Sequence, residues 1–98
     1  MTLQEREARA CAIIDSMAEE LRDVSLYLHD NPELGLDEHK AVKVINQFLE
    51  THNFTSQVGL TELPELQTAL RGDYNGTAQH KIAFLGEYDA LPELGHGC

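Results

Sequence analysis

The sequence has little of what nucleic-acid-binding, membrane-spanning or secreted proteins need. It holds 7 lysine and arginine residues against 17 aspartates and glutamates, a formal net charge of −10. Because so few basic groups cannot neutralise phosphates, we exclude nucleic-acid partners, and anionic membrane surfaces are equally unsuitable. No apolar run approaches the about 20 residues of a transmembrane helix. The N-terminus lacks a basic region followed by an apolar one, so we expect no secretory signal and a cytoplasmic location.

Cysteine is also scarce, with Cys11 and Cys98 as the two thiols. Two cysteines in a cytoplasmic chain do not make a disulfide framework. Cys11 falls on or beside an apolar helical stripe, so we expect it to be a small core residue. The 98 residues leave room for one small domain, and their 42% hydrophobic content favours a globular chain.

Two helices are predicted in the first half of the chain. Residues 3–28 place apolar side chains at helical spacing, and this helix should end by Asn31 because Pro32 follows. Residues 36–52 repeat the spacing, so a second helix is predicted there that ends at Asn53.

The connector between these helices contains His29 and Glu33. We expect both to be structural residues that hydrogen-bond within the turn rather than catalytic groups, because a lone histidine near a helix end is commonly structural. Gly35 or Asp37 is expected to cap the second helix.

Three strands are predicted in the second half, over residues 54–60, 66–71 and 79–85. Asn75-Gly76 predicts a tight turn that pairs the second strand with the third. Ile82 to Leu85 is an unbroken apolar run, typical of a strand buried on both faces. Two helices and two further strands are too few to cover it. We therefore expect the opening third of a larger α/β domain, with a native miniature as the alternative.

Two acids follow the apolar run directly. Glu87 and Asp89 lie one residue apart before a proline, and the loop beyond supplies His96 and Cys98. Open α/β sheets usually bind ligands where buried strands end, and a thiolate is a good zinc ligand. Tyr88 alternates with the acids, so we expect it to face the opposite side, in the core.

The segment Gly86-Glu-Tyr-Asp-Ala-Leu-Pro92 followed by Gly95-His-Gly-Cys98 resembles the metal-site region of the aminoacylase/carboxypeptidase superfamily of dinuclear zinc metallopeptidases. The upstream His29-Asp-Asn-Pro-Glu-Leu34 is similar to an N-terminal motif of its amidohydrolase branch, which includes dipeptidases and aminobenzoyl-glutamate hydrolases. The Gly-His that follows the cysteine in that branch is absent here.

The resemblance implies an α/β fold: the truncated N-terminal part of a three-layer zinc-peptidase-like domain, ordered helix, helix, strand, strand, strand in a mixed sheet. Residues 1–98 would be an incomplete metallohydrolase catalytic domain without its lid and dimerisation domain. Cys98 matches a metal ligand, Glu87 is a weaker candidate ligand, and Asp89 is the catalytic-site candidate, a carboxylate that orients a ligand or metal-bound water. His96 is expected to line the pocket.

The implied activity is hydrolysis of the amide bond of N-acyl amino acids or small dipeptides. Two zinc ions, with manganese as an alternative, would serve the complete enzyme, and it would dimerise through the missing domain. Most ligands and the general base lie outside these residues, so we expect this chain alone to bind no metal and to be inactive. The alternative is a non-catalytic truncated interaction module, since open sheet edges and uncovered apolar faces tend to associate.

Overall fold

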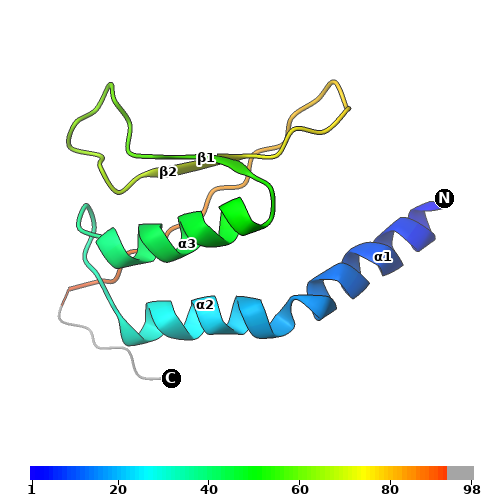
Figure 1. Ribbon diagram of the computed structural model, residues 1–98, viewed down its shortest axis with the longest axis horizontal. Coiled ribbons are helices and arrows are strands. Elements are labelled where there is room, and N and C mark those ends of the chain that lie inside the picture. Colours follow the sequence, from blue (N-terminus) through cyan, green and yellow to red (C-terminus); the bar gives the residue numbers. More distant parts are fainter. Residues whose placement is uncertain (93–98) are drawn as a thin grey trace.

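The computed structural model describes residues 1–92, in which three helices are followed by a two-stranded sheet. The helices are α1 (Leu3–Ser16), α2 (Ala18–Asp30) and α3 (His39–Thr51), and the strands are β1 (Thr55–Val58) and β2 (Leu70–Asp73). In Figure 1, α3 lies between the β1–β2 hairpin and α2, while α1 projects from the body. None of these helices is long and apolar enough to cross a membrane.

The prediction of a single helix over residues 3–28 is wrong, because the helix is interrupted at Met17 and forms α1 and α2. The Ser16 hydroxyl donates to the Ile13 carbonyl at 2.6 Å, and the Met17 amide donates to the Ile14 carbonyl at 3.0 Å. Both bonds reach only three residues back, which tightens the last turn and redirects the chain. The helix α1 begins with a capping box in which Thr2 and Glu5 bond each other's backbone amides.

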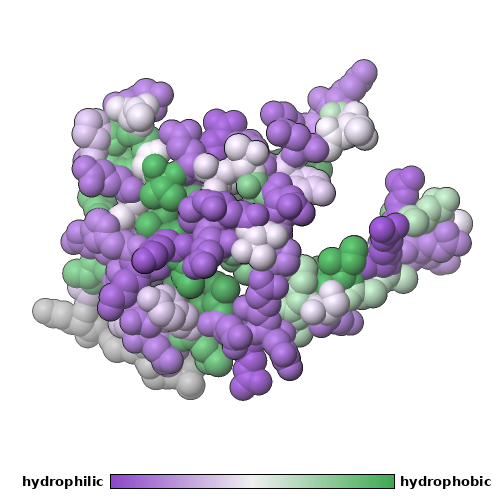
Figure 2. Space-filling model, viewed as in Figure 1, coloured by the Kyte–Doolittle hydropathy of each residue, from purple (hydrophilic) through white to green (hydrophobic). Residues whose placement is uncertain are grey.

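No residue of α1 is buried, so the expected core position of Cys11 is also wrong. The apolar stripe of this helix covers nothing within residues 1–92, because the helix points away from α3 and the hairpin. Figure 2 shows the apolar side chains (green) exposed along this projection. The predicted end of α2 is confirmed: the helix stops at Asp30, and the Asn31 side chain donates to the Tyr27 carbonyl at 2.9 Å.

The second predicted helix is confirmed in position, although α3 begins at His39 instead of residue 36. Leu36 has a φ of 71°, a left-handed conformation that a helix cannot contain. Neither Gly35 nor Asp37 caps α3, because Glu38 occupies the N-cap position without a side-chain cap bond. The predicted end is confirmed: α3 stops at Thr51, and Asn53 has a φ of 68°.

The first two predicted strands are present in shortened or shifted form. They pair antiparallel, with Thr55 opposite Asp73 and Val58 opposite Leu70. The connecting loop of residues 59–69 is closed by the Gly59 amide, which donates to the Ala69 carbonyl at 2.7 Å. The side chains of α3 cover this hairpin, so Ala41 and Val42 become the best buried apolar residues of the described chain.

The prediction of a third strand is wrong, and it is the largest difference between the expected and the observed fold. Residues 79–85 form no strand, and the chain bends at residues 77–79 instead of turning tightly at Asn75-Gly76. Ile82, Phe84 and Leu85 are 82%, 92% and 101% exposed. A strand of this kind needs a paired edge and cover on both faces, but residues 79–85 pair with neither strand of the β1–β2 sheet and lie uncovered. The mixed three-stranded sheet is therefore absent from the described part, where the sheet has two antiparallel strands.

Candidate functional site

The two predicted acids lie on an extended stretch, residues 86–90, which we call the acid segment. Glu87 and Asp89 are exposed, Tyr88 is half-buried and Ala90 is buried. This alternation places the acids on one side and Tyr88 and Ala90 against the body, as predicted for Tyr88. The segment is neither helix nor regular strand, and an isolated parallel bridge joins Ala90 to Leu34.

A cavity of about 410 Å³ lies where the acid segment passes the connector and the start of β2. Asp89 lies close to the connector. A Cβ atom added to Gly35 would stand 3.6 Å from the Oδ2 atom of Asp89. The two sequence motifs make contact beside this cavity, because the Ala90 amide donates to the Glu33 carbonyl at 2.6 Å. The cavity itself is bordered by the acid segment and by residues just beyond the upstream motif. The lining comprises Gly35, Leu36, Glu38, Leu66, Thr68, Ala69, Leu70, Gly86, Glu87, Tyr88 and Asp89.

Glu33 makes the polar contacts that fix the connector. Its Oε2 accepts from the Lys40 amide at 2.9 Å, and its Oε1 accepts from the Ala41 amide at 2.8 Å. These amides belong to the first turn of α3, whose N–H groups have no partner within the helix. The carboxylate of Glu33 thus caps α3 from outside it, which confirms the expected structural hydrogen-bonding role of this residue.

The pKa of Glu33 is set by opposing causes. Partial burial raises it, but the hydrogen bonds from the Lys40 and Ala41 amides and the positive charges of Lys40 and His39 outweigh burial. The net pKa lies below its ordinary value.

This shift predicts how Glu33 contributes to stability as pH changes. A lowered pKa means that the carboxylate stabilises the fold above the ordinary pKa of glutamate, and that this contribution is lost as pH falls through the folded-state value. The difference in unfolding free energy between wild type and Glu33→Gln should therefore be largest at neutral pH and shrink towards about pH 3. Urea unfolding followed by circular dichroism measures it, with the exposed loop variant Glu62→Gln as control. A difference that grows on acidification would contradict this account.

A second set of hydrogen bonds holds the acid segment from the β2 side. Thr68 is 3% exposed, and its hydroxyl donates to Glu38 Oε1 at 2.9 Å. The Tyr88 hydroxyl donates to the Thr68 carbonyl. Burial, with a further contribution from the negative charge of Glu38, raises the pKa of Tyr88, so its hydroxyl stays a donor at neutral pH.

Neither Thr68 nor the role of Glu38 was predicted from the sequence. Thr68 stands in a stretch predicted as strand, where nothing marked its hydroxyl for burial. Glu38 lies only four residues beyond the upstream motif, and this proximity is the signal that could have pointed to it. His29, the other connector residue, has its Nδ1 atom 3.4 Å from Asp30 Oδ1.

The described residues do not make a complete metal site. Within residues 1–92, no group of three histidine, cysteine, aspartate or glutamate side chains is placed to hold an ion. The carboxylates of Glu87 and Asp89 are oxygen donors that border one cavity. The predicted ligand Cys98 and the pocket residue His96 lie outside the described residues, so both stay predictions.

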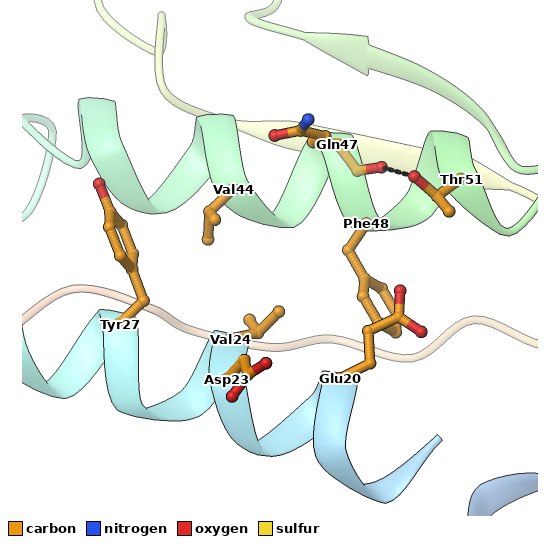
Figure 3. Close-up of a pocket in the computed structure, with 8 residues that line it drawn as sticks. All are labelled: Glu20, Asp23, Val24, Tyr27, Val44, Gln47, Phe48 and Thr51. Carbon is orange, nitrogen blue, oxygen red and sulfur yellow. Dashed lines mark hydrogen bonds between the residues drawn. The ribbon is translucent and has the colours of Figure 1, made fainter. Parts of the chain in front are cut away.

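Another hollow, of about 380 Å³, lies between α2 and α3 and shares no lining residue with the first. Figure 3 shows Val24 and Tyr27 of α2 and Val44 and Phe48 of α3 directed into this space. Acids occur only at its α2 side, where Glu20 Oε1 lies 2.9 Å from His52 Nε2. We assign it to interhelical packing, because it is mainly apolar and remote in sequence from the acid segment.

Comparison with known proteins places the similarity among hydrolases. The chain is 35% identical over 96 residues to an Xaa-Arg dipeptidase of Mus musculus and 31% identical over 99 residues to an Xaa-Arg dipeptidase of Homo sapiens. Each match covers 92% of this chain but only 22% and 23% of the relative. An uncharacterized hydrolase of Staphylococcus haemolyticus is 39% identical over 66 residues, which cover 67% of this chain and 16% of that protein.

The chain therefore resembles two proteins named Xaa-Arg dipeptidase over nearly its whole length, and an uncharacterized hydrolase over two thirds of it. It spans less than a quarter of the length of these relatives. No family model and no solved structure matches the chain.

Proposed function

We propose that this chain contributes the N-terminal part of the catalytic domain of a metal-dependent amidohydrolase. The proposed reaction is hydrolysis of an amide bond in small dipeptides or N-acyl amino acids. Dipeptides that end in arginine are the first substrates to test, because two relatives are named Xaa-Arg dipeptidases. The observation that supports the proposal is the contact between the two motifs, in which Ala90 bonds Glu33 and pairs with Leu34, next to a cavity lined by Glu87 and Asp89.

In the proposed enzyme, Cys98 and Glu87 are metal ligands and Asp89 is the carboxylate that orients a ligand or bound water. The cofactor is a pair of zinc ions, with manganese as the alternative, and it would polarise the scissile carbonyl. Asp89 is suited to its role because its neighbours on both sides are hydrogen-bonded to the body while its carboxylate remains exposed. The remaining ligands, the general base and a dimerising lid domain would come from outside these 98 residues.

This proposal predicts that the 98-residue chain by itself is inactive and takes up no stoichiometric zinc. Two carboxylates and one thiol are fewer donors than a closed tetrahedral site requires. Equilibrium dialysis against zinc should return less than one bound ion per chain at micromolar metal, and an assay with Xaa-Arg dipeptides should show no turnover. Cys98→Ala serves as the matched variant. Tight one-to-one uptake that this substitution abolishes would contradict the prediction and favour a small metal-binding protein.

A second candidate is a non-catalytic interaction module, and the exposed apolar run supports it. Ile82, Phe84 and Leu85 present a large apolar surface next to unpaired backbone, a combination that favours strand addition by a partner. Size-exclusion chromatography with light scattering separates the candidates. A stable, specific complex of the inactive chain supports the module, and a monodisperse monomer counts against it.

A further inference from the structure

Asp89 is flanked on both sides by residues that are fixed to other parts of the chain. Before it, the Tyr88 hydroxyl bonds the Thr68 carbonyl, and Thr68 itself is held by Glu38. After it, the Ala90 amide donates to the Glu33 carbonyl at 2.6 Å. The acid segment is therefore held in place by one hydrogen bond on each side of Asp89, and not by pairing within a sheet.

We infer that Glu33 is a positioning residue for Asp89, because its side chain bonds the first turn of α3 while its own carbonyl bonds the Ala90 amide. The inference rests on the proposed function, in which Asp89 supports the metal site. It goes further by assigning a task in that site to a residue of the upstream motif. The same residue joins α3, the connector and the acid segment, so its placement fixes all three together.

The side-chain bonds of Glu33 determine where its carbonyl points. With both carboxylate oxygens bonded, to the Lys40 and Ala41 amides, the side chain keeps little rotational freedom. Pro32 restricts the backbone before it, and a turn closed by the Asp37 amide on the Leu34 carbonyl at 3.0 Å restricts the backbone after it. Loss of the carboxylate would release the connector at this point and leave the Glu33 carbonyl free to turn away from Ala90.

The connector also touches Asp89 more directly. Gly35 follows Glu33 by two residues. The Asp89 Oδ2 atom borders the space that a Cβ atom on Gly35 would occupy. A displacement of residues 33–35 would thus change both the bond to Ala90 and the surface against which the Asp89 carboxylate lies. Thr68 and Tyr88 would still hold the other side, so the expected change is local to Asp89 and Ala90.

Amide hydrogen exchange and carboxyl ¹³C shifts of the 98-residue chain test this inference. In Glu33→Ala, loss of the α3 cap should speed exchange in the whole fold, and the Ala90 amide should be accelerated about fivefold more than the β1–β2 amides of Gln57 and Arg71, as expected when a bond of ordinary cap strength is lost as well. The Asp89 carboxyl carbon should shift. Glu33→Gln, which keeps one acceptor oxygen, should restore part of both effects, and Glu62→Gln should change neither.

Unchanged Ala90 exchange in a folded Glu33→Ala chain would overturn the inference. So would equal acceleration of Ala90 and the β1–β2 amides in both variants, since this would show a role in global stability alone. If Glu33→Ala does not fold, Glu33→Gln decides by the same comparison. These readouts need neither metal nor turnover, so they stand or fall separately from the proposed hydrolase activity.

Discussion

Replacing Phe84 with alanine is expected to leave the stability of the 98-residue chain within about 0.5 kcal/mol of wild type, yet to destabilise a longer protein that supplies the rest of the proposed domain by about 3–5 kcal/mol. In this chain Phe84 is 92% exposed, so its ring stabilises nothing. If residues 79–85 become a buried strand when the rest of an α/β domain is present, the same ring enters a core. Its removal then leaves a cavity.

Urea unfolding of both proteins measures this contrast, with Phe84→Leu as the matched variant that keeps most of the apolar volume. In the longer protein Phe84→Leu should cost much less stability than Phe84→Ala, and in the 98-residue chain neither substitution should matter. An equally small effect of Phe84→Ala in both proteins would show that the segment stays exposed. The interaction module would then be the better description of the chain.

Replacing Val42 with aspartate is expected to unfold most of the 98-residue chain. Val42 is 5% exposed and belongs to a core in which the other well-buried apolar residues are Ala41 and Ala90, within the described part. An unpaired carboxylate at this position costs about 3 kcal/mol or more, a large share of the stability of any small domain. Because α3 contacts both strands and α2, losing its buried face should release all of them together.

Circular dichroism at neutral pH checks this expectation through the loss of helical signal. The control is Gln47→Asp, which places the same charge at an exposed position of the same helix. A Val42→Asp chain that melts with the same midpoint as Gln47→Asp would contradict the assignment of the core to the face of α3 that covers the hairpin.

The sequence predicted those parts of the fold that depend on local rules. Apolar spacing and Pro32 located the helical regions, and the left-handed Asn53 ends α3 where the pattern stops. The break at Met17 was not predictable from spacing, because apolar residues continue through it and the change of direction accompanies hydrogen bonds from the Ser16 hydroxyl and the Met17 amide. The start of α3 was misplaced because its capping carboxylate comes from Glu33, seven residues before the first amide that it binds.

In the candidate site too, local patterns predicted some features and missed others. Alternation correctly predicted that Glu87 and Asp89 face away from Tyr88. The hydrogen bonds that hold this segment join residues 20 and 57 positions apart, from Thr68 to Tyr88 and from Glu33 to Ala90, and no local pattern reports them. The prediction of a buried third strand was wrong for a related reason. A buried strand must pair with adjacent strands and be covered on both faces. Its apolar composition shows only that it is suited to such an environment.

The most direct test of the account is a zinc-dependent hydrolysis assay on a longer protein that contains these residues and the rest of the proposed domain, with Xaa-Arg dipeptides as substrates. The account predicts turnover that chelation removes, a loss of about 10- to 100-fold in Asp89→Asn, and normal activity in Glu62→Gln. A well-folded, zinc-loaded product that cleaves no dipeptide or N-acyl amino acid, or an Asp89→Asn variant as active as wild type, would contradict it.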